Sequence, residues 1–201
     1  MVLWQPKGGQ GLPAAPAAGA LGAETGWYFS KPETGICSAP SLAVKPPLDR
    51  LLATFRDALA CLGKKPLDVT VQSVHDPSSY PKLYQCSIDP RYLDWVLREH
   101  GSFLTHDPSA SVMVIKPSPF STVELALNKL IYITGEKLRK FKSICVQQGP
   151  RPSPTLQILS HVRSSIHASM EHMGQFRLFI DKLEAEIVQQ TEEEDRPYAP
   201  F

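Results

Sequence analysis

The tetrapeptide His-Asp-Pro-Ser occurs twice, starting at His75 and at His106, and it contains residue types that can do chemistry. If the two segments come together, two imidazoles and the carboxylates of Asp76 and Asp107 can bind a divalent metal ion. The same residues also form type I turns, because Asp accepts local amide hydrogens and the following Pro presets φ. We favour the turn interpretation and keep a small metal-dependent enzyme, built on the two turns, as an alternative function.

Motifs of the common enzyme classes are missing from the sequence. It contains no phosphate-binding loop, no dinucleotide-binding glycine pattern and no nucleophile elbow. Three more histidines, His161, His167 and His172, do not have the spacing of a zinc-binding helix. We therefore expect a non-catalytic protein with no catalytic residues, no metal ion and no cofactor.

Four cations, Lys137, Arg139, Lys140 and Lys142, form a basic cluster. We expect the cluster at the C-terminal end of a helix, where positive charge complements the helix dipole. The alternative is an anion-binding site for nucleic acid or for an acidic lipid headgroup, including a viral structural or nucleocapsid-associated role. We do not favour nucleic acid, because the cations spread around a helix at about 100° per residue and the net charge of the chain is only +1.

The elements that must position these residues begin after a Gly-, Pro- and Ala-rich segment. Residues 1–45 show no periodic apolar pattern, so we expect a flexible, disordered N-terminal tail. Three consecutive aromatic residues, Trp27, Tyr28 and Phe29, interrupt it. They either pack back onto the folded part of the chain or dock on a partner.

Residues 46–118 have the pattern of an α+β subdomain. The sequence predicts a helix over 48–62, strands over 67–74, 82–88 and 111–116, and a helix that Asp89 caps and Gly101 ends. A further strand-like run covers 102–105. The order strand, His-Asp-Pro-Ser turn, strand, helix then repeats, which indicates either a degenerate internal duplication or a coincidence.

Residues 119–191 have the pattern of a helical hairpin. Apolar residues at helical spacing predict one helix over 119–144, and a Pro-rich connector precedes a second helix over 154–191. The second helix carries a coiled-coil-like stripe that we expect to bind a partner: Leu159, Val162, Ile166, Met173, Phe176, Ile180, Leu183 and Ile187. Residues 192–201 form an acidic, Pro-containing tail.

The predicted fold is therefore α+β: a small antiparallel sheet of two β-hairpins, an N-terminal helix and an intervening helix, followed by a long C-terminal antiparallel αα-hairpin. We expect an assembly subunit or adaptor that binds a protein partner, or a second copy of itself, through that hairpin. Four well-separated cysteines with no CxxC motif and the absence of a secretory signal favour reduced thiols and an intracellular location, cytoplasm or nucleus. No apolar run is long enough to predict a transmembrane helix.

Overall fold

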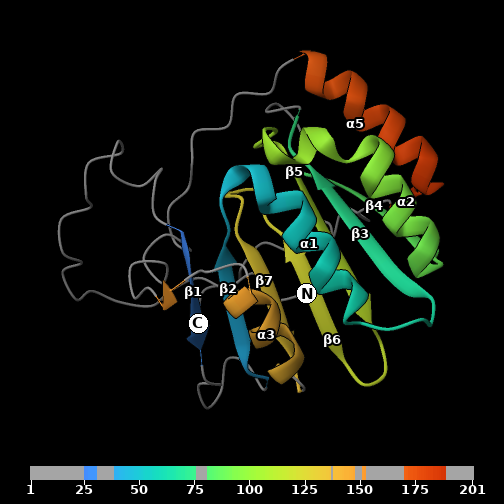
Figure 1. The fold of residues 1–201 in the computed structure, drawn as a ribbon. Coiled ribbons are helices and arrows are strands. Elements are labelled where there is room, and N and C mark those ends of the chain that lie inside the picture. Colours follow the sequence, from blue (N-terminus) through green and yellow to red (C-terminus); the bar gives the residue numbers. More distant parts are fainter. Residues whose placement is uncertain are drawn as a thin grey trace, which may run out of the picture.

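A computed structural model describes residues 25–30, 39–75, 81–136, 138–147, 151–152 and 170–188, and it shows an α+β fold (Figure 1). The strands are β1 Gly26–Ser30, β2 Ser41–Lys45, β3 Leu67–Ser73, β4 Lys82–Ile88, β5 Ala110–Lys116, β6 Ser121–Leu125, β7 Ile131–Gly135, β8 Arg151–Pro152 and β9 Glu186–Ile187. The α-helices are α1 Leu51–Ala60, α2 Pro90–His100, α3 Arg139–Gln147 and α5 Met170–Leu183, with short 3₁₀ helices at Leu48–Arg50 and Ser102–Thr105.

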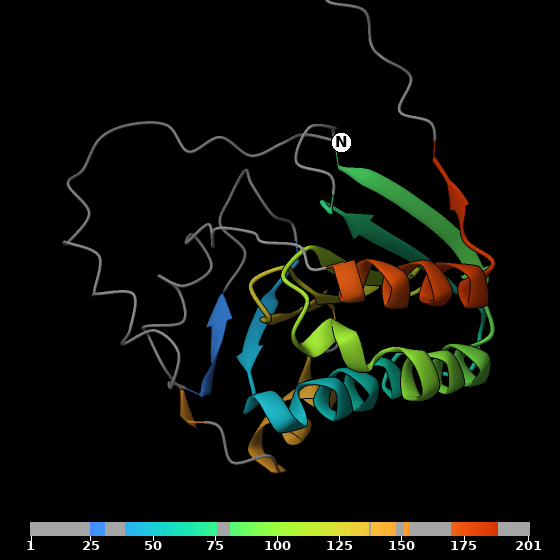
Figure 2. The same ribbon diagram turned by 90° about the horizontal axis from the view of Figure 1, so that it is seen from above.

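The strands form one open sheet in the order β8-β1-β2-β7-β6-β5-β3-β4-β9. Every neighbouring pair from β1 to β9 is antiparallel, and the two-residue β8 adds to β1 in parallel at the other edge. The helices among the described residues pack against one face of this sheet (Figures 1 and 2). The sheet therefore includes strands from all three segments that the sequence distinguished, 1–45, 46–118 and 119–191.

Alternation along the strands places the core between the sheet and the helices. In β3, Leu67, Val69 and Val71 are buried while Asp68 between them is exposed. The helices contribute their apolar sides to the same core, chiefly through the buried residues Leu51, Phe55, Leu93, Val96, Leu97, Phe176, Phe179, Ile180 and Leu183. On the opposite face, one cross-strand row connects Tyr28, Ala43, Tyr132, Glu124, Met113, Thr70 and Gln85.

Local signals in the sequence identify α1, α2 and their flanking strands correctly. Gly63 follows α1 with a φ of +106°, as expected for the glycine that ends a helix. Asp89 caps α2, because its Oδ1 accepts hydrogen bonds from the backbone amides of Arg91 at 2.8 Å and Tyr92 at 3.4 Å. Strands β3, β4 and β5 lie within one residue of their predicted bounds.

The predicted helix over 119–144 is wrong. Residues 121–135 form the β6–β7 hairpin, and only the short α3 follows. The apolar residues of this segment fit a helical repeat, but β-branched Val123, Ile131 and Ile133 also alternate with polar residues, as strands require. Lys129 has a φ of +61° in the turn between the strands, a conformation that an α-helix does not allow.

The predicted αα-hairpin is therefore also wrong, because its first helix is replaced by two strands. In the segment predicted as the second helix, the structure describes a helix only over Met170–Leu183. Glu184, with a φ of +53°, follows it, and the chain then pairs with β4 as β9. The predicted helical residues 154–169 lie outside the described residues.

The structure also bears on the N-terminal segment and on the possible internal duplication. The segment predicted as a flexible tail contains β1 and β2, whereas residues 1–24 and 31–38 lie outside the described residues. Of the two interpretations of the repeated order, duplication is wrong, because residues 102–105 form a 3₁₀ helix and β5 is followed by a strand. The pairing of β2 with β7 is long-range, and short sequence patterns do not encode it.

Candidate functional site

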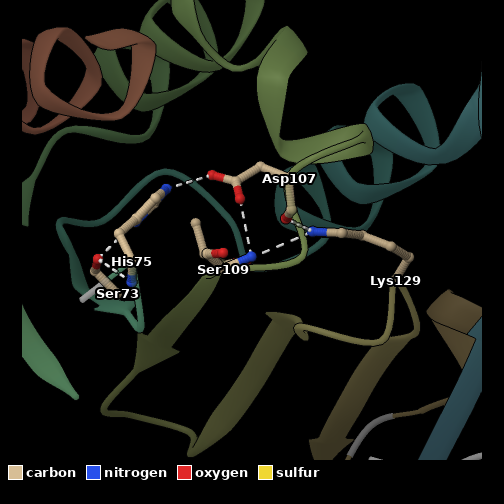
Figure 3. Close-up of polar contacts among 6 residues, drawn as sticks. Ser73, His75, Asp107, Ser109 and Lys129 are labelled. Atoms are coloured by element: carbon tan, nitrogen blue, oxygen red, sulfur yellow. Dashed lines mark hydrogen bonds and ion pairs between the residues drawn. The ribbon is translucent and has the colours of Figure 1, made fainter. Parts of the chain in front are cut away.

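The structure brings together one residue from each His-Asp-Pro-Ser segment. His75 follows β3 and Asp107 precedes β5, and the β3–β5 pairing places the two side chains side by side (Figure 3). Nε2 of His75 lies 2.8 Å from Oδ2 of Asp107. His75 is 8% exposed and Asp107 is fully buried, so this polar pair belongs to the interior of the fold.

Two serines extend the pair into a buried polar cluster, which we define as Ser73, His75, Asp107, Ser109 and Lys129. Oγ of Ser73 lies 2.7 Å from Nδ1 of His75, and Oδ1 of Asp107 accepts a hydrogen bond of 2.8 Å from the backbone amide of Ser109. Because a carboxylate only accepts hydrogen bonds, Nε2 of the ring carries a proton. In the neutral imidazole, Nδ1 then accepts the hydroxyl hydrogen of Ser73.

Lys129 approaches the cluster from the β6–β7 turn, as Figure 3 shows. Its Nζ donates hydrogen bonds to the backbone carbonyls of Asp107 and Ala110. Burial lowers the pKa of Lys129 from 10.5 to about 8, and the negative charge of Asp107 opposes part of that shift. The lysine therefore ties the β6–β7 turn to the segment that carries Asp107.

The order Ser73–His75–Asp107 is that of a nucleophile, a base and an acid. Such a chain activates a serine only if a substrate can reach the hydroxyl group. Here Ser73 is buried, and the ring of Phe176 from α5 lies 4.8 Å from the His75 ring, centroid to centroid. The arrangement in the structure is a buried core network covered by α5, in which Ser73, His75 and Asp107 are hydrogen-bonded while Oγ of Ser109 has no hydrogen-bond partner.

The second imidazole of the alternative metal hypothesis lies in a different environment. His106 is exposed, whereas His75 is buried, so the two rings do not converge as the metal hypothesis requires. Asp76 lies outside the described residues. The part of the chain that the structure describes contains no group of three or more His, Cys, Asp or Glu side chains that could hold a metal ion.

The residues predicted to bind a partner fall into three groups. Leu159, Val162 and Ile166 lie outside the described residues. Phe176, Ile180 and Leu183 are buried in the chain's own core, on the side of α5 that faces the sheet and α2. Met173 is half-buried and Ile187 is exposed.

The aromatic triplet lies in β1. Trp27 and Phe29 pack against the main core, while Tyr28 packs on the other face of the sheet against Leu130. Of the two expectations for these residues, packing on the chain's own folded part is the one that the structure shows.

The basic cluster lies at the opposite end of a helix from the one predicted. Arg139 begins α3, Lys140 and Lys142 follow in its first turns, and Lys137 lies outside the described residues. Nζ of Lys142 lies 4.6 Å from the centre of the Phe29 ring, a cation–π contact. The charges of Arg139 and Lys140 therefore oppose the helix dipole of α3.

Comparison with protein-family models, with curated proteins and with solved structures finds no match for this chain. Among the described residues, no helix is both long and apolar enough to cross a membrane.

The sequence analysis missed an exposed surface on α2, which we name the α2 ridge: Arg91, Tyr92, Trp95, Arg98 and Glu99. Tyr92 is 39% exposed and Trp95 is 42% exposed, and their rings stack with centroids 5.4 Å apart. At about 100° per residue, all five side chains project within about 60° of the direction of Trp95. The signal was available, because Tyr92 and Trp95 are three residues apart and off the stripe of Leu93, Val96 and Leu97.

Proposed function

We propose that this protein is a non-catalytic assembly subunit or adaptor that binds a protein partner through the α2 ridge. The observation that supports this most strongly is the stacked, exposed pair of Tyr92 and Trp95. Tyrosine, tryptophan and arginine are the residue types that carry most binding energy in protein interfaces. Arg91 and Arg98 flank the pair, so the ridge combines all three types.

The ridge is held rigidly by contacts on its other sides. Leu93 and Val96 fix the buried side of α2, and the hydroxyl of Tyr92 donates a 3.1 Å hydrogen bond to the carbonyl of Lys182 on α5. Asp94 accepts hydrogen bonds of 2.8 Å from Arg56 and Arg98. A rigid surface loses little conformational freedom on binding, which favours its use as a docking site.

The other functions considered from the sequence have weaker support. Catalysis at Ser73 and His75 requires substrate access, but both side chains are buried and the ring of Phe176 packs against His75. A nucleic-acid site at the basic cluster would rest on Arg139, Lys140 and Lys142, which begin a short helix, and Lys142 already contacts Phe29.

Photo-crosslinking tests the proposed function. A photoreactive amino acid replaces Trp95 in the full chain, expressed in the cells that produce it, and the control carries it at Phe120. Phe120 is also an exposed aromatic residue, 50% exposed, but it lies in the turn between β5 and β6. We expect a discrete protein adduct from position 95 and none from position 120. Equal labelling from both positions, or no adduct from position 95, contradicts the proposal.

A further inference from the structure

The charges of the α2 ridge are arranged symmetrically about Trp95. Arg91 lies four residues before Trp95 and Glu99 four residues after it, so the three form one row along the helix. Tyr92 and Arg98 lie three residues to either side. Arg91 and Glu99, the two ends of the row, carry opposite charges that attract each other.

We propose that the partner of the α2 ridge is a second copy of this chain, related by a two-fold axis that passes beside Trp95. This inference rests on the proposed function and names the partner. In a two-fold interface, if residue i contacts residue j of the other copy, j also contacts i. Antiparallel packing of the two α2 helices along this row then places Arg91 beside Glu99 of the second copy, twice.

Ridges-into-grooves packing supports this arrangement. Residues four apart form one ridge on a helix surface, and the most common class of helix pair aligns such ridges from both helices. The row of Arg91, Trp95 and Glu99 is a ridge of this kind, and all three residues are exposed. Packed in reverse direction, the two rows bring the tryptophans together at the centre and the opposite charges together at both ends.

The charges of the row do not suit the isolated helix. Arg91 is the second residue of α2 and Glu99 is the last but one. The helix dipole favours negative charge in the first turn and positive charge in the last turn, so both charges oppose it. The dipole of α2 stabilises neither charge, but each has an opposite partner in the two-fold arrangement.

The inference is tested by charge reversal in the full chain. Arg91→Glu creates two like-charge contacts in the dimer, and so does Glu99→Arg, so we expect either variant to weaken self-association at least about tenfold. An equimolar mixture of the two variants restores both attractive contacts. Sedimentation velocity over a range from about 1 µM to about 200 µM suits the micromolar affinity expected for a small interface.

Two controls separate loss of the interface from loss of the fold. Both reversals improve the match to the helix dipole, so at concentrations below the dimer Kd the melting temperature of each variant should equal or exceed that of the wild type. Recovery of the dimer on mixing also requires that both variants are folded. Phe120→Ala removes an equally exposed aromatic side chain outside the ridge and should leave the association unchanged.

The expected result is a wild-type dimer, two monomeric single variants and a dimer in their mixture. A wild-type chain that stays monomeric, or a dimer that both reversals leave intact, overturns the inference. The proposed function can survive that result, because crosslinks from position 95 to a different protein would show that the ridge binds another partner. Absence of both the dimer and the crosslinks contradicts the proposed function as well.

Discussion

Lys129 and Asp107 are joined through the backbone, because Nζ of Lys129 donates a hydrogen bond to the carbonyl of Asp107 while the Asp107 carboxylate pairs with His75. The buried residue Asp107 thus connects the β6–β7 turn, through Lys129, to the end of β3, through His75. Ser73, His75, Asp107 and Lys129 are linked by hydrogen bonds, so we expect single substitutions among them to have large effects.

Asp107→Ala should lower the free energy of unfolding by about 3–5 kcal/mol, because it leaves His75 and the Ser109 amide buried without their acceptor. Asp107→Asn should cost less, since its side-chain oxygen can still accept a hydrogen bond. Arg56→Ala, which breaks a partly exposed ion pair with Asp94, should cost less than about 1 kcal/mol. Urea unfolding measures all three, and similar losses for Asp107→Ala and Arg56→Ala would refute a structural role for the cluster.

Lys129 should make the protein more stable as the pH rises from about 8 to 10.5. Its pKa is lower in the folded state, so in this window the unfolded chain binds more protons and stability increases with pH. The stability of the wild type relative to Lys129→Met should therefore increase by about 2 kcal/mol across the window. Subtracting the free energy of unfolding of Lys129→Met from that of the wild type cancels the titration of other groups. A difference that stays constant with pH would disprove the lowered pKa of Lys129.

Ile180 and Leu178 are neighbours on α5 with opposite exposure, 7% and 47%. Ile180→Asp should unfold the protein or cost about 3–5 kcal/mol, because the new charge is buried without a partner. Leu178→Asp should leave the melting temperature almost unchanged. A folded, stable Ile180→Asp variant that has lost an interaction would instead support the coiled-coil stripe predicted from the sequence.

Trp27→Ala should lower the free energy of unfolding by about 2 kcal/mol, because the indole of β1 packs against the main core. Circular dichroism melts of the full chain provide the measurement, with Phe120→Ala as the exposed aromatic control. Equal melting temperatures for wild type and Trp27→Ala would indicate that β1 adds nothing to the core.

Arg139→Glu should raise the free energy of unfolding by about 0.3–1 kcal/mol, because negative charge suits the first turn of α3. The sequence interpretation, with this residue near a helix C-terminus, gives the opposite sign. Arg139→Ala should fall between the wild type and Arg139→Glu in thermal melts. Fluorescence anisotropy with short RNA on the same proteins tests the nucleic-acid alternative, which requires strong, salt-dependent binding that Arg139→Glu abolishes.

The sequence predicts those elements whose signals are local. Asp89, Pro90 and Gly101 mark the bounds of α2, and alternating Val69 and Val71 identify β3. The helix predicted across residues 121–135 is wrong because Val123, Leu127 and Leu130 fit the spacing of a helix as well as that of a hairpin. The pairing of β6 with β5 and of β7 with β2 selects the hairpin. The sequence highlights both His-Asp segments but not the contact between His75 and Asp107, which depends on the β3–β5 register.

The strand order also determines when each part of the sheet can form. The hairpins β3–β4, β5–β6 and β6–β7 join neighbours in sequence, whereas β2 pairs with β7, which follows it only after α1, α2 and four other strands. Local contacts form faster than distant ones, because closing a long loop costs more chain entropy. During synthesis, the β1–β2 hairpin therefore cannot join the sheet until β7 has left the ribosome, because β2 pairs with β7. Until then, Trp27 and Phe29 cannot pack against the complete core.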